Sequence, residues 1–220
     1  MRDTNQTIIK FNYDKNLSND DFVISKSNKH IFEFLDLWPK WEKNFINIIG
    51  EKLSGKTHLT DIFIKKHKGV KIEAKFLNND HLKKIKVYQN IILENLTLDV
   101  DEKLLYSLLN SIDQDNKYII ITSSIPIVYI DFKLNDLKSR TKSFLLLNIE
   151  KPDDELIFAI ILKNLSDRQI LLDKKLINYI IKRIERSYSK IHDFIYKIDQ
   201  LSLKKKKSID LNIIKEVLGE

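Results

Sequence analysis

The stretch FINIIGEKLSGKTHLTDIF, residues 45–63, holds two of the four glycines in this chain of 220 residues. Its residues that match the phosphate-binding pattern G-x-x-x-x-G-K-[ST] are Gly50, Gly55, Lys56 and Thr57. The apolar run 45–49 predicts a buried strand, and residues 57–67 predict an amphipathic helix. A glycine turn between a strand and a helix N-terminus binds phosphate, because unpaired N–H groups and the helix dipole converge there. A merely flexible turn would explain one glycine but neither Lys56 nor Thr57, so we predict a phosphate loop.

The composition predicts a soluble, cytoplasmic protein with one sizeable core. Hydrophobic residues make up 43% and charged residues 31% of the chain, and no apolar run approaches the roughly 18 residues of a membrane span. The first residues lack the pattern of a signal peptide. Without cysteine there is no disulfide or thiolate metal site, and the five histidines show no ligand spacing. We therefore expect a metal only as Mg²⁺ that accompanies nucleotide.

The net charge of +7 does not by itself predict contact with nucleic acid. Lysine supplies most of it, with only five arginines, and abundant asparagine and isoleucine suggest a compositional origin in AT-rich codons. The dense basic run LSLKKKKSID, residues 201–210, is typical of a solvated helix end or loop. We expect any association with DNA to be indirect.

Strands and helices alternate through the first two thirds of the chain, which predicts a five-stranded parallel sheet covered by helices. The predicted strands are Phe45–Ile49, Val70–Ala74, Asn90–Leu93, Tyr118–Thr122 and Leu145–Ile149. The predicted helices between them include Lys29–Leu37, Thr57–His67 and Asp101–Ser111.

After EKPDDE the pattern becomes helical only. The predicted helices are Asp153–Leu165, Asp173–Glu185, Tyr188–Leu203 and Asp210–Leu218. We predict a tail over residues 1–18, an α/β nucleotide-binding domain over 19–151 and a small all-helical lid over 152–220. An α/β phosphate-loop core followed by a helical lid is the outline of an AAA+ ATPase module.

Two further positions suggest chemistry. The strand NIILENL ends at Glu94, where phosphate-loop proteins place an acidic residue that holds Mg²⁺; an exposed strand-end carboxylate is the alternative. The next residue is Asn95, and an amide cannot act as a general base, so we expect poor hydrolysis. Arg140 is either a surface arginine or a finger directed at a nucleotide in a neighbouring subunit.

Several segments together resemble the DnaA family of bacterial replication initiators. They are DDFVISKSN (20–28), GEKLSGKTHL (50–59), IILEN (91–95), IITSSIP (120–126), LNDLKSR (134–140), KPDDELIFAIILK (151–163) and SIDLNIIKEVL (208–218). The chain is most similar to the shorter Hda-type regulators, because it stops after the lid instead of continuing into a DNA-binding domain. It also begins just before the core with QTIIKF, which is similar to a sliding-clamp-binding motif. The resemblance implies that Gln6, Ile9 and Phe11 bind the clamp.

The resemblance also implies roles for individual residues. Residues implied to bind ADP or ATP are Gly50, Ser54, Gly55, Lys56, Thr57 and His58, with Phe22, Val23 and Asn28 near the adenine. Thr57 and Glu94 would hold Mg²⁺, Ser124 and Ser189 occupy the two sensor positions, and Arg140 is the finger that acts in trans. Departures from the family pattern weaken hydrolysis or sensing: Leu53 replaces a glycine, Glu94 an aspartate, Ser124 an aspartate and Ser189 an arginine.

The resemblance therefore predicts a regulator that binds nucleotide and the clamp β subunit and promotes hydrolysis of initiator-bound ATP, with self-association possible. Two alternatives stay open at this point. One is an independent ATPase such as a helicase loader, against which Asn95 and Ser189 argue. The other is a structural or DNA-tethering adaptor that has lost nucleotide, which Leu53 leaves possible.

Overall fold

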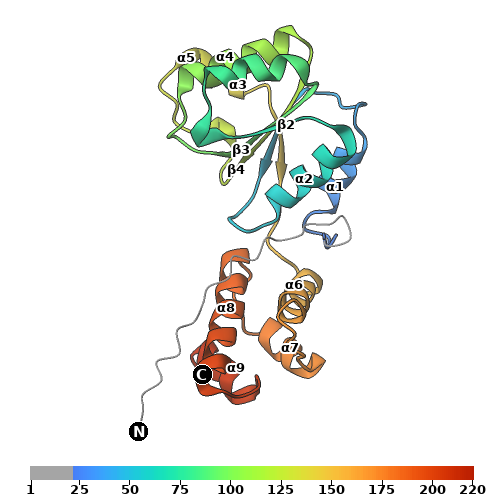
Figure 1. Ribbon diagram of the computed structural model, residues 1–220, viewed down its shortest axis with the longest axis vertical. Coiled ribbons are helices and arrows are strands. Elements are labelled where there is room, and N and C mark those ends of the chain that lie inside the picture. The colour runs from blue at the N-terminus through green and yellow to red at the C-terminus, as the bar shows by residue number, and fades with distance from the viewer. Residues whose placement is uncertain (1–21) are drawn as a thin grey trace.

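The computed structural model describes residues 22–220 and shows an α/β core joined to a separate group of helices (Figure 1). The core elements are α1 Lys29–Asp36, β1 Phe45–Ile49, α2 Lys56–His67, β2 Val70–Glu73, α3 Asn79–Lys84, β3 Asn90–Leu96, α4 Glu102–Gln114, β4 Tyr118–Ser123, α5 Asn135–Thr141 and β5 Leu145–Asn148. The helical group contains α6 Asp154–Ser166, α7 Lys174–Ile181, α8 Tyr188–Lys205 and α9 Leu211–Leu218.

The five strands form one parallel sheet in the order β2-β3-β4-β1-β5, which confirms the predicted fold class. Every residue of β1 is buried, because helices cover both faces of the sheet. The strand order reverses at β1, and the phosphate loop follows it, which is where open α/β sheets bind ligands. Strand β3 runs three residues beyond its predicted end, through a bulge between Leu93 and Leu96.

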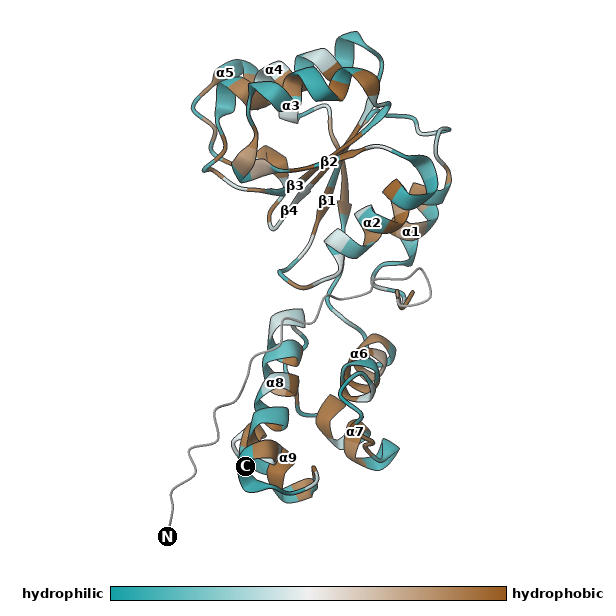
Figure 2. Ribbon diagram, viewed as in Figure 1, coloured by the Kyte–Doolittle hydropathy of each residue, from teal (hydrophilic) through white to brown (hydrophobic). Residues whose placement is uncertain are grey.

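Helices α1 and α2 cover one face of the sheet, and α3, α4 and α5 cover the other (Figure 1). Each face packs its own apolar cluster, centred on Ile46, Ile48 and Ile92 on the first face and on Leu93, Leu105 and Ile121 on the second. The central strands β1 and β4 are mainly hydrophobic (Figure 2), as expected for central parallel strands. Helices α3 and α5 are too short for an unambiguous helical period, and the sequence did not predict them.

The lid contains four helices and no strand among the described residues, which confirms the predicted all-helical module. Its centre is a cluster of buried isoleucines that includes Ile157, Ile177 and Ile191. The side chains of Asp153, Asp173, Ser187 and Asp210 each accept a hydrogen bond from a backbone N–H at the start of a helix. Helix α7 ends at Ile181 rather than Glu185, and the residues after it turn towards the Ser187 cap of α8.

The domain boundary predicted at residues 151 and 152 stays a prediction; it lies between β5 and α6. Within residues 22–220, no helix is both long enough and apolar enough to cross a membrane. The predicted tail and its residues Gln6, Ile9 and Phe11 lie outside the described residues.

Candidate functional site

The phosphate loop connects β1 to α2 through a backbone that depends on its two glycines. Gly55 lies at the N-cap of α2 with φ of +94°, in the left-handed region that favours glycine. A Cβ at Gly50 would lie 2.6 Å from Ser54 Oγ and 3.1 Å from Ile149 Cβ. The side chain of Ser54 is buried, and its Oγ has no hydrogen-bond partner. The loop thus presents a hydroxyl and the α2 N-terminus without internal partners, as an anion site requires.

Lys56 begins α2, and its side chain is folded onto the loop. Its Nζ donates to the carbonyl oxygens of Gly50 at 2.6 Å and Glu51 at 2.8 Å. Burial lowers the pKa of Lys56, against the opposing effect of the Glu51 and Glu94 carboxylates. The adjacent Thr57 side chain is exposed. A phosphate group would offer the Lys56 ammonium a charged acceptor in exchange for neutral carbonyls.

Glu51 links the phosphate loop to the lid, a contact that the sequence did not predict. Its carboxylate accepts a hydrogen bond from the Ser187 hydroxyl, from Tyr188 N at 3.0 Å and from Ser189 N at 3.3 Å. Burial raises the pKa of Glu51, but these hydrogen bonds outweigh it and hold the pKa below its usual value. The carboxylate therefore caps the N-terminus of α8, where an anion is favoured.

The two predicted sensor positions differ in their surroundings. Ser189 lies in the first turn of α8, and its Oγ donates to the Lys52 carbonyl at 3.4 Å, so the lid meets the phosphate loop at this residue. Ser124 is exposed just after β4. Neither serine carries the positive charge that an arginine sensor would bring to a phosphate.

The backbone around Ser124 is positioned by Asn47, a fully buried residue of β1. Asn47 Nδ2 donates to Ile121 O at 3.0 Å and to Ser123 Oγ at 2.9 Å, and Asn47 Oδ1 accepts from Ile127 N at 2.8 Å. This network ties the end of β4 to β1. The sequence signal for this network is a polar residue inside an otherwise apolar strand, and it does not by itself identify the partners.

Glu94 lies at 5% exposure, and both of its carboxylate oxygens are engaged. Its Oε1 accepts from Thr60 Oγ1 at 2.8 Å, and its Oε2 lies 3.1 Å from Lys71 Nζ. Lys71 also pairs with Asp61 Oδ1 at 2.5 Å. The exposed strand-end carboxylate considered as an alternative is therefore wrong, because α2 covers Glu94. Within the described chain, no cluster of three metal-ligating side chains is present.

Asn95 follows Glu94 at the β3 bulge with φ of +55°. Its backbone N–H donates to Thr122 Oγ1 at 2.9 Å, and its side-chain amide donates to Glu73 Oε1 at 3.0 Å. The side chain is held towards the β2 edge of the sheet. A general base is not available from an amide in this arrangement.

The segment before α1 lies beside the phosphate loop, and its predicted contact with adenine stays a prediction. The Phe22 ring packs edge-on against His58 at 5.1 Å, and a Cβ on Gly55 would lie 3.3 Å from Phe22 Cε2. Asn28 is buried; its amide donates to Val23 O at 2.9 Å, and its Oδ1 accepts from Ser25 N at 2.9 Å. Asn28 thus shapes the turn that carries Phe22 and Val23.

Arg140 lies in the last turn of α5, on the other face of the sheet from α2. Its Nη1 lies 3.0 Å from Asp113 Oδ2 on α4, with 26% of the arginine side chain exposed. Arg140 is therefore not grouped with the phosphate loop of its own chain. An exposed pair of this kind contributes under about 1 kcal/mol, so the guanidinium can exchange it for another anion.

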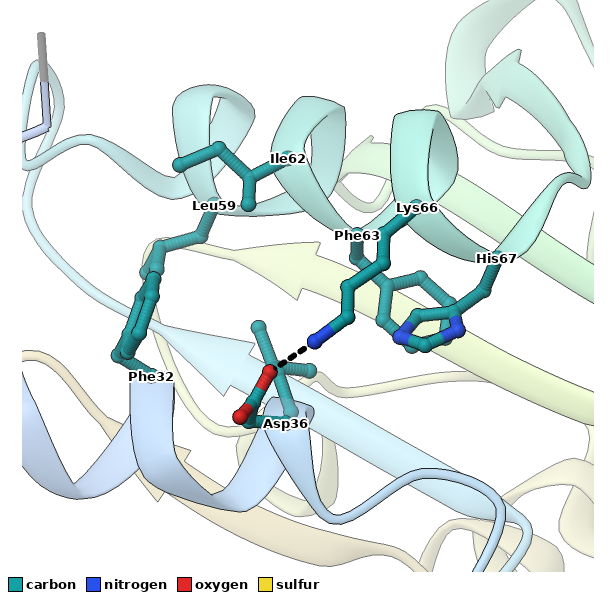
Figure 3. Close-up of a pocket in the computed structure, with 8 residues that line it drawn as sticks. Phe32, Asp36, Leu59, Ile62, Phe63, Lys66 and His67 are labelled. Atoms are coloured by element: carbon teal, nitrogen blue, oxygen red, sulfur yellow. Dashed lines mark hydrogen bonds and ion pairs between the residues drawn. The ribbon is translucent and has the colours of Figure 1, made fainter. Parts of the chain in front are cut away.

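The defined pocket lies between α1 and α2 rather than at the phosphate loop (Figure 3). Its volume is about 260 Å³, and apolar side chains from both helices, including Phe32, Leu59 and Phe63, line it. The ion pair between Lys66 and Asp36 bridges the two helices there (Figure 3). This pocket has neither a helix N-terminus nor free backbone donors that would hold phosphate.

Comparisons with known proteins agree with this geometry. Residues 153–218 match the family described as "Hda, lid domain". The chromosomal replication initiator protein DnaA of Buchnera aphidicola subsp. Cinara cedri is 25% identical over 226 residues, covering 91% of this chain and 52% of that protein. The chain thus spans about half the length of the curated relatives that it matches.

Solved structures show the same fold at lower identity. Domain III of the Thermotoga maritima initiator DnaA superposes with a TM-score of 0.72 at 18% identity, covering 93% of this chain and 96% of that one. AMPPCP-bound DnaA from Aquifex aeolicus superposes with a TM-score of 0.64 at 22% identity, covering 84% and 65%.

The sheet order, the phosphate loop after β1 and the helical lid make this chain an AAA+ module. The lid match and the initiator relatives then place it within that class. Its lid matches the Hda lid family, and over 91% of its length the chain is similar to DnaA replication initiators.

Proposed function

We propose that the chain binds an adenine nucleotide, ADP or ATP, at the Gly50–Thr57 loop. The unpartnered Ser54 hydroxyl, the glycine-shaped turn and the Lys56 ammonium support this assignment. The Phe22–Asn28 segment supplies an aromatic ring and a fixed turn beside the loop, where the base is expected. The AMPPCP-bound relative supports the same ligand class. The Mg²⁺ predicted at Thr57 and Glu94 would have to compete with the contacts that Glu94 already makes.

We further propose that the protein is a cytoplasmic regulator of the Hda type, which promotes hydrolysis of ATP bound to DnaA and so limits re-initiation of replication. The lid match carries this proposal, because the matching family is described by the regulator's name. The lack of a base at Asn95 also argues for action on another protein's nucleotide. The sliding clamp would be the second partner, through Gln6, Ile9 and Phe11; contact with DNA would be indirect, and self-association is possible.

The test is hydrolysis of DnaA-bound ATP in the presence of DNA-loaded clamp. Arg140→Ala should lower the stimulation at least about 100-fold, since an arginine supplied in trans is worth roughly 10³–10⁵-fold in other nucleotide hydrolases. Lys138→Ala is the matched control, because Lys138 lies in the same helix and also forms one exposed ion pair, with Asp131. Deletion of residues 1–11 should abolish stimulation while leaving ADP binding intact.

Three results would contradict the regulator. The finger role fails if Arg140→Ala stimulates as strongly as the wild type. If the chain without residues 1–11 binds the clamp as tightly as the full chain, the proposed clamp-binding motif is wrong. Brisk ATP hydrolysis by the purified protein alone would favour the independent ATPase instead.

A further inference from the structure

Lys71 brings a fixed positive charge to the acidic residue that phosphate-loop proteins use to hold Mg²⁺. It projects from β2 on the face covered by α2, as do Ile92 and Glu94 of the neighbouring β3. Its Nζ lies 3.1 Å from Glu94 Oε2 and 2.5 Å from Asp61 Oδ1 of α2. Three elements therefore converge on one ammonium group.

The carboxylate of Glu94 has little capacity left for a metal or for the water that a metal would carry. Thr60 donates to Oε1 and Lys71 to Oε2, and only 7% of the side chain is exposed. An ionised carboxylate accepts up to about four hydrogen bonds, but burial removes the solvent that would reach the remaining sites. The residues present do not fit the predicted metal role of Glu94.

Lys71 is the shared cation of two carboxylates. Asp61 Oδ1 and Glu94 Oε2 both contact its Nζ, so the three groups together carry a formal charge of −1. Removal of Lys71 would change this charge to −2 and leave both carboxylates without their shared partner, which is costly in a partly buried setting.

We propose that Lys71 is a resident cation that takes the place of Mg²⁺ at Glu94, so that nucleotide binds this chain without a divalent metal. Lys71 acts as a positioning residue: it holds Glu94 and Asp61 and keeps α2 and its phosphate-binding N-terminus against β3. The inference rests on the proposed nucleotide binding, but it concerns a different property of the site.

The first experiment is calorimetric titration of ADP into the full chain, in MgCl₂ and in EDTA. The wild-type Kd should agree within about twofold between the two buffers, whereas Lys71→Gln should bind at least about fivefold more tightly with Mg²⁺. Lys84→Gln, which removes an exposed lysine that has no ion pair among the described residues, should behave like the wild type. Lys71→Arg should restore metal independence, because it keeps the charge.

A second experiment needs no nucleotide. Melting curves in MgCl₂, compared with NaCl of equal ionic strength, should be unchanged for the wild type and shifted upwards for Lys71→Gln, because Asp61 and Glu94 are then free to bind the metal. If Lys71→Gln does not fold, the ADP titrations are repeated with Glu94→Gln. The proposal then expects this substitution to change the Kd for ADP by the same factor in MgCl₂ and in EDTA.

Wild-type binding that is at least about tenfold weaker in EDTA would overturn the inference and leave the nucleotide site intact. The inference would also be overturned if Glu94→Gln weakened ADP binding in MgCl₂ but not in EDTA. Absence of ADP binding in both buffers would instead overturn the proposed nucleotide function, and the inference with it.

Discussion

At the scale of single residues, the backbone of the phosphate loop restricts which side chains fit at its positions. Gly50 leaves no room for a Cβ beside Ser54, and Gly55 adopts a left-handed backbone. Leu53, where the family usually has glycine, also has a positive φ, of +68°, and its side chain is 46% exposed. A non-glycine residue in this region costs roughly 1–2 kcal/mol. Strain of this kind is found at functional loops, where the surrounding structure maintains it.

Gly50→Ala should lower the free energy of unfolding by about 1–3 kcal/mol, because the new methyl group would meet Ser54 Oγ and Ile149. Adding Ser54→Ala should restore part of this loss, since it removes the atom that would lie 2.6 Å away. Urea denaturation of the two single variants and the double variant measures the coupling. Strictly additive effects would show that the two positions do not interact.

At the scale of elements, the N-terminus of α8 is the place where the lid is attached to the nucleotide loop. Ser187 caps the helix, and the Glu51 carboxylate adds a charge from another module to the same helix end. The interaction joins residues 136 to 138 positions apart in the chain. The Glu51 side chain therefore connects the phosphate loop to the lid, beside the contact of Ser189 with Lys52.

This contact predicts a pH dependence. The pKa of Glu51 is lowered in the folded protein, so its contribution to stability is present above the unfolded pKa of about 4.5 and disappears as the pH falls through the folded pKa. Because solvent screens the partly exposed carboxylate, Glu51→Gln should destabilise the protein by about 0.5 kcal/mol at pH 7 and by progressively less below pH 4.5. Thermal melts between pH 3 and pH 7 measure the difference.

Glu42→Gln, which removes an exposed carboxylate from the loop before β1, is the control and should show no such trend. A Glu51→Gln difference that stayed constant with pH would mean that the carboxylate charge does not stabilise α8.

At the scale of the whole molecule, the core and the lid are joined by apolar packing as well as by hydrogen bonds. Tyr188 and Leu156 belong to lid helices, yet they are buried in the same cluster as Ile149 and the α1–α2 face of the sheet. The Tyr188 hydroxyl also donates to Glu150 O at 3.0 Å. From this packing we expect the two modules to unfold as one cooperative unit.

Tyr188→Ala should remove that cooperativity. The substitution empties a site that is 3% exposed and should cost about 3 kcal/mol, as large-to-small changes at buried aromatic residues do. Calorimetry should show one transition for the wild type and two for the variant. Tyr196→Ala, at an exposed position of the same helix, should leave the single transition in place. One transition in Tyr188→Ala would show that the modules are coupled by other contacts.

The sequence by itself determined the elements and their order. Four strand predictions end within one residue of the observed ends. For β1 and β4 the reason is that buried parallel strands are nearly continuous apolar runs. The phosphate loop was also readable, since Gly50, Gly55, Lys56 and Thr57 are adjacent in the chain and their chemistry is local. The four lid helices followed from the period of their isoleucines and leucines.

Only the tertiary structure decided which charges meet. Glu51 reaches α8 from 136 or more positions away, Lys71 reaches Glu94 from the neighbouring strand, and Asn47 fixes a loop that follows another strand. No local pattern marks these residues, because the partner of a long side chain is set by strand order and helix packing. Arg140 shows the same limit: its position in the chain suggested a finger, but only the fold revealed that Asp113 already pairs with it.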